Sequence, residues 1–467
     1  MWKTKYKKKL TVVTALLIIC FLTLIGTTLS KIGFTPMNHE DYQSSRKYSL
    51  RIRDDKAYYQ KIMGNIYDNT GYPIFMTDCV IDKASINYHE SYSHLLGNPH
   101  IEDYGLFSSY YQTLTDDKAD DITEHKGYSL VLTINDELQQ YAYSQTKGKR
   151  ASIVVLKRHS GELLAMTSTY EESFDLGCDL DDSLLTRYNN AYEPIWQNEA
   201  LHAYAPGSCQ KIVTAVMGYE NGLDDYTFDD LGYVEYDGNR IYNNDKAVYG
   251  NGLDMTTAFC ASSNSYFASL MNTVDNSTLH NTSSKLRLDY TFETDFGVFT
   301  NYLSYGWRSG DSSRFSRGLL GIGQKSELSS VGLALVTQAV IDNEIYLPHV
   351  VKSTSYNGKD GSLQTANINQ EQLLDSGMLS DDTCAKVSLL METAARSSGY
   401  QLSSNIIGAK SGTAEITVDG VNTNRATLVA YDNNYIVVVS VIEQGVYGIG
   451  NKDIMENIFD YLSGLQA

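Results

Sequence analysis

The apolar and polar positions of the chain first separate an N-terminal hydrophobic segment from everything that follows. The run LTVVTALLIICFLTLIGTTL, from Leu10 to Leu29, holds twenty residues and no charge. A helix of that length rises about 30 Å, the thickness of the hydrocarbon core of a bilayer. Five lysines lie within the first nine residues, and only Lys31 closely follows the run. By the positive-inside rule, this pattern predicts a cytoplasmic tail at 1–9, a transmembrane anchor at 10–30 and a body outside the membrane. A cleaved signal peptide fits less well, because the run is long for such a segment and no A-x-A-like cleavage site follows it.

Behind the hydrophobic segment, residues 31–125 are polar, rich in tyrosine and only weakly periodic, with turn signals such as Gly97-Asn98-Pro99. They predict a small, irregular N-terminal module. From Tyr128 onward the pattern sharpens into alternating and helical periods. The elements it predicts are a strand at 128–134, a helix at 136–146, a hairpin of 151–157 and 162–169, a buried helix at 208–219, strands at 410–417, 426–432 and 434–443, and a helix at 451–465.

The order of these elements predicts the fold class. Strands come early, helices lie in the middle and strands return late, which indicates an α+β fold whose sheet combines distant parts of the chain. The segment 208–219 is apolar on nearly all sides and should therefore be buried. In the last helix, Ile454, Ile458 and Leu462 recur every four residues and predict a face that packs on the sheet.

The composition of the 467 residues is that of a folded protein with two or three domains, since 42% of them are apolar and 20% are charged. The net charge of −19 argues against nucleic-acid binding, for which a basic surface is expected. The six cysteines are scattered, and they form neither a C-x-x-C pair nor a cluster with zinc-site spacing. No metal chemistry is therefore predicted.

The first candidate for chemistry is Ser208, which follows Pro206-Gly207 at the start of the predicted buried helix, one turn before Lys211. A serine hydroxyl becomes a good nucleophile only when a base takes its proton. A lysine in a dry site can be that base, because burial disfavours its charged form. The helix N-terminus also favours negative charge developing nearby. Taken alone, S-x-x-K is a frequent chance match, and an N-cap serine with an incidental lysine explains it better.

Two further motifs offer partners for this pair. Ser262 and Asn264, within AFCASSNSYFASL, supply a hydroxyl and a carboxamide that could relay a proton and hold a substrate amide. The run Lys410-Ser411-Gly412-Thr413 opens a predicted strand, where a cation, two hydroxyls and an unobstructed glycine suit an anionic, extended peptide. Taken alone, the motif of Ser262 and Asn264 would be explained as a polar turn between helices. The run from Lys410 to Thr413 would be explained as a surface strand with a bulge.

Together, the three motifs occur in the order S-x-x-K, S-x-N and K-[ST]-G, which is the signature of penicillin-binding proteins and serine β-lactamases. The chain resembles a class B penicillin-binding protein, the single-anchor D,D-transpeptidase of bacterial cell-wall synthesis. The segments similar to motifs of that family are GNIYDNTGYPIF, LTINDELQQYA, RHSGELLAMTS, APGSCQKIVTA, GIGQKSELSSVGLALV and AKSGTAE. The resemblance covers about residues 60–465, although Lys325 replaces a glycine usual in the family. It implies a penicillin-binding or serine β-lactamase-like transpeptidase domain at 126–467, preceded by the N-terminal module at 31–125.

The resemblance also implies roles for the residues of the first two motifs. Ser208 would attack the carbonyl of the penultimate D-alanine of a peptidoglycan stem peptide, and Lys211 would take its proton. Backbone N–H groups of Ser208 and Thr413 would form the oxyanion hole. Ser262 would pass a proton to the departing D-alanine, and Asn264 would hold the substrate backbone. An amine of a neighbouring stem would then resolve the acyl-enzyme, without a metal or an organic cofactor.

The third motif is implied to bind the substrate. Lys410, Ser411 and Thr413 would engage its terminal carboxylate, and Gly412 leaves room for the peptide. The expected ligands are therefore stem peptides and the β-lactam antibiotics that acylate this family. The expected partner is a membrane-embedded glycan polymerase, because class B members lack glycosyltransferase residues of their own.

Other functions remain as alternatives. A D,D-carboxypeptidase uses the same residues with water as the acceptor. A class D-like β-lactamase or another β-lactam-binding protein shares two of the motifs, but no convincing E-x-x-x-N element for a deacylating water lies between Ser262 and Lys410. A catalytically silent scaffold is less favoured, because all three motifs are intact.

Overall fold

A computed structural model describes residues 63–76, 87–101, 104–116, 127–178, 180–190, 195–303, 313–357, 362–418 and 420–465. All of these residues belong to one compact unit, Leu50–Ala467. Within these ranges, no helix has the length and apolar character needed to cross a membrane. The predicted tail at 1–9 and anchor at 10–30 lie outside the described residues.

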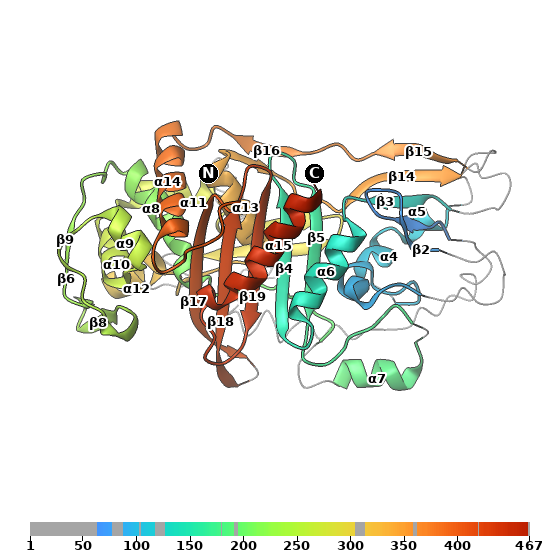
Figure 1. Cartoon of the computed structure of the whole chain (residues 1–467), viewed down its shortest axis with the longest axis horizontal. Coiled ribbons are helices and arrows are strands. Elements are labelled where there is room, and N and C mark those ends of the chain that lie inside the picture. The colour runs from blue at the N-terminus through green and yellow to red at the C-terminus, as the bar shows by residue number, and fades with distance from the viewer. Residues whose placement is uncertain are drawn as a thin grey trace, which may run out of the picture. The chain divides into compact units, whose positions relative to one another are not determined.

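The centre of the fold is a five-stranded antiparallel sheet with the order β17-β18-β19-β4-β5 (Figure 1). Its strands are β4 (Arg150–Lys157), β5 (Leu163–Thr169), β17 (Gly408–Val418), β18 (Val421–Tyr431) and β19 (Tyr435–Ile442). Two strands come from an early part of the chain and three from its end. The predicted α+β fold, with a sheet made from distant segments, is therefore confirmed, and β17 forms one edge of that sheet.

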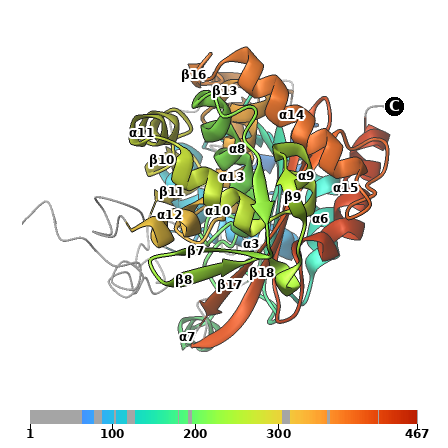
Figure 2. The same cartoon turned by 90° about the vertical axis from the view of Figure 1, so that its left-hand side faces the viewer.

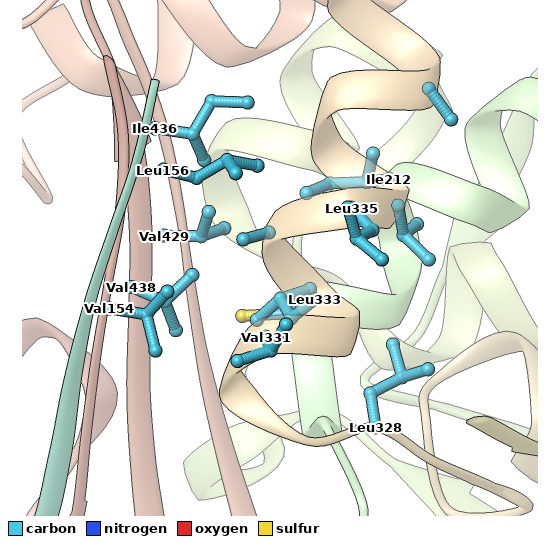
Figure 3. Packing of buried hydrophobic residues seen from close by; sticks show 14 of the residues in the cluster. Val154, Leu156, Ile212, Leu328, Val331, Leu333, Leu335, Val429, Ile436 and Val438 are labelled. Atoms are coloured by element: carbon cyan, nitrogen blue, oxygen red, sulfur yellow. The ribbon is translucent and has the colours of Figure 1, made fainter. Parts of the chain in front are cut away.

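Helices cover both faces of the central sheet, because successive strand residues point to opposite sides and both sets are apolar. One face packs against α6 (Asp136–Thr146) and α15 (Lys452–Leu465). The other face packs against α13 (Ser330–Ile341) and α8 (Lys211–Glu220). Figure 3 shows this second contact, which joins Val154, Leu156, Val429, Ile436 and Val438 of the strands to Ile212, Val331, Leu333 and Leu335 of the helices.

A second five-stranded sheet, with the order β15-β14-β3-β1-β2, lies beyond α6 when the molecule is followed from β17 (Figure 1). Its strands are β1 (Ile66–Tyr67), β2 (Pro73–Phe75), β3 (Ser129–Leu132), β14 (Val351–Asn357) and β15 (Leu363–Ile368). Because β1 pairs in parallel with β3, the described residues 63–76 extend a sheet built from later segments. Short helices of the same part of the chain are η2 (Glu90–Tyr92), α3 (Ser93–Leu96), α4 (Gly105–Ser109) and α5 (Tyr111–Leu114).

A helical region adjoins the β17 edge of the central sheet (Figure 2). Its elements are η3 (Gly207–Gln210), which leads into α8, and α9 (Met255–Ala261), α10 (Asn264–Thr273), α11 (Asn276–Lys285), α12 (Arg314–Gly321) and α14 (Asp381–Arg396). Small strand pairs join them: β6 (Phe228–Asp230) with β9 (Gly250–Leu253), β7 (Tyr233–Tyr236) with β8 (Asn239–Tyr242), β10 (Tyr290–Thr294) with β11 (Gly297–Leu303) and β12 (Ser326–Glu327), and β13 (Glu344–Tyr346) with β16 (Leu373–Ser376). The remaining short elements are α7 (Asp182–Asn190), η4 (Asn244–Lys246) and η5 (Gly448–Asn451).

Local sequence signals place several elements as predicted. Asn135 caps α6, and its side chain accepts a hydrogen bond from a first-turn backbone N–H at 2.9 Å. Gly161 adopts a φ of 86° in the connection between β4 and β5, which a glycine does without strain. In α15, Ile458 and Leu462 are fully buried against the central sheet, as the four-residue period indicated.

Candidate active site

Ser208 lies in η3, a 3₁₀ turn that runs directly into α8 and packs against the backbone of β17. A Cβ atom on Gly207 would lie 2.5 Å from the carbonyl oxygen of Thr413, and one on Gly412 would lie 2.3 Å from that of Pro206. Gly207 also has a φ of 54°, a conformation that favours glycine. Glycines at these two positions therefore let the turn and the strand meet at backbone contact, which brings Ser208 beside the K-S-G-T motif.

The Nζ atom of Lys211 lies among four oxygen atoms. It is 2.9 Å from Ser208 Oγ, 2.5 Å from Ser262 O, 3.1 Å from Ser262 Oγ and 2.8 Å from Asn264 Oδ1. The side chain is completely buried, as expected for a residue of a buried helix. Burial, and after it the positive charge of Lys410, lowers the pKa of Lys211 well below its usual value. The shift favours the neutral amine, which is the form that can accept a proton.

The partners of Lys211 also orient that neutral amine. The carbonyl oxygen of Ser262 and Oδ1 of Asn264 can only accept hydrogen bonds. They can take the two N–H groups of the neutral amine, which leaves its single lone pair for one of the two neighbouring hydroxyls, that of Ser208 or that of Ser262. The geometry thus places a base within reach of the candidate nucleophile.

The S-x-N motif forms the junction of two helices. Ser262 ends α9 in a left-handed conformation, with a φ of 55°, and Ser263 caps α10 by accepting a hydrogen bond from Tyr266 N at 3.1 Å. Asn264, the first residue of α10, donates from Nδ2 to the carbonyl oxygen of Tyr242 at 3.0 Å. A carboxamide nitrogen has two N–H groups, and within the described part of the chain the second one has no acceptor, so it can serve a ligand. The S-x-N residues therefore form the polar turn between two helices, and the same residues lie at the candidate site.

A buried network that the sequence motifs did not reveal holds this junction. Ser263 Oγ donates to Asp230 Oδ2 at 2.6 Å, and Asn243 Nδ2 donates to both oxygens of that carboxylate at 2.9 Å. The backbone N–H of Ser265 donates to Asn243 Oδ1 at 2.9 Å. Burial raises the pKa of Asp230, but hydrogen bonds led by the one from Ser263 outweigh it and hold the pKa below its usual value. The ionised Asp230 fixes the start of α10 and, through it, Ser262.

Lys410 is the second completely buried lysine of the site. Its Nζ donates to Ser262 Oγ at 3.1 Å, to the Tyr400 hydroxyl at 3.1 Å and to Ser411 O at 2.9 Å. The rings of Phe259 and Tyr400 lie 5.5 Å and 5.8 Å from the same nitrogen. Three acceptors match the three N–H groups of an ammonium ion. The surroundings of Lys410 therefore suit a cation.

The backbone of the third motif lies on the open edge of the central sheet. The N–H of Ser411 donates to the Tyr400 hydroxyl at 2.8 Å, so it does not point toward β18. Backbone N–H groups two residues apart on a strand face the same side, and the N–H of Thr413 therefore points off the same edge. The Thr413 nitrogen would lie 3.1 Å from a Cβ on Gly207, which places it next to Ser208.

The two hydroxyls of this motif each have a partner. Ser411 Oγ lies 2.7 Å from the Tyr400 hydroxyl, and Thr413 Oγ1 accepts a hydrogen bond from the backbone N–H of Gly448 at 2.9 Å. A Cβ on Gly448 would lie 2.3 Å from the carbonyl oxygen of Gly412, so η5 also approaches β17 closely. Among the described residues Thr413 Oγ1 has no acceptor for its own proton, so that proton can serve a ligand.

Cys209, the neighbour of Ser208, points away from this group of side chains. Its side chain is buried, and Sγ donates to the carbonyl oxygen of Lys410 at 3.5 Å. Burial raises the pKa of the thiol to about 11. The thiol is therefore protonated at neutral pH, and it packs against β17.

A buried cluster of charged side chains stabilises the segment of the chain that precedes Ser208. Arg425, on β18, donates to the carbonyl oxygens of Leu328 at 2.8 Å and Tyr204 at 3.3 Å. Arg150 donates to Glu199 Oε1 and to the Tyr204 hydroxyl at 2.8 Å and 2.9 Å. Burial raises the pKa of Glu199, but Arg150 and neighbouring groups outweigh it, and the pKa lies below its usual value. The cluster ties this segment to the central sheet.

The residues that sequence analysis missed share one property, which is that they lie outside the motif they support, at separations that run from 10 residues between Tyr400 and Lys410 to 35 between Thr413 and Gly448. Tyr400, Asp230, Asn243 and Gly448 belong to no short motif, and only their hydrogen bonds identify them. In the described part of the chain, no three His, Cys, Asp or Glu side chains are grouped as metal ligands would be. A serine hydroxyl beside a buried lysine amine, as at Ser208 and Lys211, is an arrangement that can carry out acyl transfer.

Residues 151–461 match the family described as "Penicillin binding protein transpeptidase domain". This span is more than half of the chain and contains all eight predicted site residues. The curated protein "Peptidoglycan D,D-transpeptidase MrdA" of Acinetobacter baumannii is 28% identical over 175 residues, which cover 35% of this chain and 26% of MrdA. "Penicillin-binding protein PbpB" of Mycolicibacterium smegmatis is 33% identical over 107 residues, which cover 21% of this chain and 15% of PbpB. The matches thus span about a quarter or less of these relatives.

Solved structures show the same fold. Penicillin-binding protein A of M. tuberculosis, in a ceftriaxone acyl-enzyme complex, superposes with a TM-score of 0.76 at 19% identity, covering 86% of this chain and 98% of that one. PBP2 of Pseudomonas aeruginosa, in complex with WCK 5153, gives a TM-score of 0.70 at 22% identity, covering 86% and 96%. The predicted transpeptidase-like α+β fold is confirmed by this likeness.

Proposed function

The chain belongs to the penicillin-binding protein transpeptidase family, and from this premise we propose that it is a class B peptidoglycan D,D-transpeptidase that cross-links stem peptides through an acyl-enzyme on Ser208. The observation that carries the proposal is the position of Lys211 Nζ, which lies 2.9 Å from Ser208 Oγ. Burial lowers the pKa of that lysine, and the two carbonyl acceptors can take its N–H groups, so that its lone pair is available to the serine. A serine nucleophile requires such a base.

In the first proposed step, Ser208 Oγ attacks the carbonyl carbon of the penultimate D-alanine while Lys211 takes the hydroxyl proton. A C–O bond forms, and an electron pair of the carbonyl group moves to its oxygen. The N–H groups of Ser208 and Thr413 stabilise this oxyanion. The contact between the turn at Gly207 and the β17 backbone supports the assignment, because it sets the Thr413 nitrogen close to Ser208.

In the second step, the oxyanion collapses and the C–N bond to the terminal D-alanine breaks. Ser262 gives its proton to the departing nitrogen, and the Lys211 ammonium returns a proton to Ser262. The distance of 3.1 Å between Lys211 Nζ and Ser262 Oγ supports this relay. Lys410, held at the same hydroxyl, supplies positive charge for the terminal carboxylate, which Ser411 and Thr413 also bind.

In the third step, the amine of a neighbouring stem attacks the acyl carbon. Its proton passes to Lys211, the bond to Ser208 Oγ breaks, and the serine recovers a proton, which leaves the site as it began. Asn264 holds the substrate amide with its remaining N–H group. A β-lactam would acylate Ser208 in the same way and block the third step. Penicillin-binding protein A of M. tuberculosis has been crystallised as such an acyl-enzyme, with ceftriaxone.

Two measurements test the function. The purified full chain, exposed to a labelled penicillin, should gain the mass of one adduct, and peptide mapping should place it on the peptide that contains Ser208. A stem pentapeptide with a free amine acceptor should then yield the cross-linked product. If the tetrapeptide forms instead, with water as acceptor, the protein is a D,D-carboxypeptidase. If no adduct forms, neither activity is correct.

The proposed compartment follows from the N-terminal sequence. We place the body outside the cytoplasm on an uncleaved anchor at 10–30, because lysines precede that apolar run. N-terminal sequencing that finds a mature chain starting near residue 30 would contradict this. The proposed partner is a membrane-embedded glycan polymerase that contacts the anchor and the module at 31–125. Co-purification of such a polymerase, and its loss when the anchor is exchanged for an unrelated one, would support the partnership.

A further inference from the structure

Tyr400 belongs to none of the sequence motifs, yet its hydroxyl contacts two residues of the third one. The oxygen lies 3.1 Å from Lys410 Nζ, 2.8 Å from Ser411 N and 2.7 Å from Ser411 Oγ. We propose that Tyr400 is a positioning residue that fixes the Ser411 hydroxyl as a hydrogen-bond donor to the carboxylate of the substrate. The inference rests on the proposed function, because that function supplies the carboxylate.

The proposal follows from the number of protons and lone pairs on the Tyr400 hydroxyl and its three partners. A tyrosine hydroxyl has one proton and two lone pairs. The N–H of Ser411 and the ammonium of Lys410 can only donate, and together they occupy both lone pairs. The proton of Tyr400 must therefore go to its third partner, Ser411 Oγ. Because Ser411 accepts this bond, its own proton is left for a group outside the cluster.

The direction of the Ser411 proton matters for the recognition of an anion. An ionised carboxylate can only accept hydrogen bonds, so a serine that presented a lone pair would repel it. A hydroxyl fixed as a donor before binding needs no reordering when the ligand arrives. Ser411 is half-buried on the edge strand β17, and the charge of Lys410 lies beside it. The three residues thus present both a positive charge and an oriented proton.

The position of Tyr400 is itself fixed by the turn that follows α14. The backbone N–H of Tyr400 donates to Ser397 O at 3.0 Å. Arg396, the last residue of α14, donates to the carbonyl oxygens of Leu402 and Ser403 at 2.8 Å and 2.9 Å. The ring of Tyr400 is buried with the residues that cover the α15 face of the central sheet. The hydroxyl therefore has little freedom to leave the cluster.

The test compares two ligands that differ only in the carboxylate. Tyr400→Phe keeps the ring and removes the hydroxyl, and its second-order rate constants of acylation are measured with benzylpenicillin and with benzylpenicillin methyl ester. We expect the rate with the acid to fall about tenfold, the scale of one hydrogen bond to a charged group, and the rate with the ester to change less than about twofold. A loss of fold would lower both rates together.

Three further variants make the test decisive. Tyr431→Phe removes another buried tyrosine hydroxyl of the same domain, which contacts only Ser388 O at 3.4 Å among the hydrogen bonds of the described residues, and should change neither rate. Ser411→Ala should reproduce the selective loss with the acid, and the double variant Tyr400→Phe/Ser411→Ala should be no slower than Ser411→Ala. Equal losses with acid and ester, or additive losses in the double variant, would overturn the proposal. The proposal would also be overturned if the Ser411→Ala protein kept the wild-type ratio of the two rates. This outcome can be measured even if Tyr400→Phe does not fold. A wild-type chain without a Ser208 adduct would instead overturn the proposed function.

Discussion

Lys211 and Lys410 bring their Nζ atoms to the same oxygen, Ser262 Oγ, each at a distance of 3.1 Å. Two buried ammonium ions on one hydroxyl repel each other, and burial adds to the cost of charging both. The structure resolves this conflict at Lys211, whose pKa is lowered by burial and then by the charge of Lys410. This difference supports the proposal that Lys211 is the base and that Lys410 supplies charge, with Ser262 between them.

The first prediction concerns the nucleophile. Ser208→Ala should abolish covalent labelling by penicillin, because it removes the atom that carries the acyl group. Cys209→Ala should label almost normally, since burial raises the pKa of that thiol to about 11 and its sulfur faces the carbonyl oxygen of Lys410. Intact mass spectrometry measures both. Labelling that survives in Ser208→Ala and is lost in Cys209→Ala would mean that the nucleophile is wrongly assigned.

The second prediction concerns the base. Lys211→Ala should slow acylation about 10²–10⁴-fold, the usual cost of losing a general base. In the wild type, the rate of acylation should rise with pH through the lowered pKa of Lys211 and then become constant, because only the neutral amine takes the serine proton. The same shift makes folding stability rise with pH between the folded and the unfolded pKa of this lysine, since only the unfolded chain then keeps the proton.

Lys410 provides a test of the cause of that shift. Lys410→Met removes the like charge, so the pKa of Lys211 should rise and the acidic limb of the rate profile should move to higher pH. Lys410→Arg keeps the charge and should leave the limb near its wild-type position. The profiles are measured as acylation rate against pH for the three proteins. A limb that does not move in Lys410→Met would show that the second lysine does not tune the first.

The fourth prediction concerns the contact between the nucleophile turn and the edge strand. Gly412→Ala should reduce acylation about 100-fold, because its Cβ would lie 2.3 Å from Pro206 O and must displace the turn that carries Ser208. Gly464→Ala is the matched control, since a Cβ there meets nothing within 4 Å on the exposed side of α15. This control should keep the wild-type rate and gain at most about 1 kcal/mol of stability. Wild-type acylation by Gly412→Ala would contradict the role of the contact.

The fifth prediction concerns the buried charges behind the site. Glu199→Ala removes the carboxylate that neutralises Arg150, and both side chains are almost completely buried. We expect a loss of about 3–5 kcal/mol in the free energy of unfolding, measured by denaturant titration. Glu443→Ala breaks the half-exposed pair with Lys149 and should cost less than about 1 kcal/mol. Equal effects of the two substitutions would show that burial does not set the cost.

The local parts of the fold and of the site were predictable from the sequence. Ser208 and Lys211 are three residues apart, so a helical turn alone brings them to one face. The β-branched residues between clear turns predict the strands β17, β18 and β19, and the capping residue Asn135 predicts the start of α6. Such signals depend on neighbours along the chain, and a sequence displays them directly.

The supporting residues could not be predicted in the same way. Tyr400 is one of 36 tyrosines in the chain, and nothing in its neighbourhood distinguishes it from the others. Asp230 precedes Ser263 by 33 residues and has no motif of its own. Their roles exist only because separate segments pack against one another. The side that a buried polar group faces is set by this packing, and no short pattern records it.

By itself, then, the sequence determined the motifs, the order of the elements and the helical pairing of Ser208 with Lys211, because each of these depends on spacing along the chain. Only the tertiary structure decided that Lys410 meets Ser262 across 148 residues and that the two lysines share one hydroxyl. It also gave the physical reason for proposing Lys211, and not Lys410, as the base. That reason is the lowered pKa of Lys211, which is caused by burial and by the charge of Lys410, and both arise only when the central sheet and the helical region pack around the site.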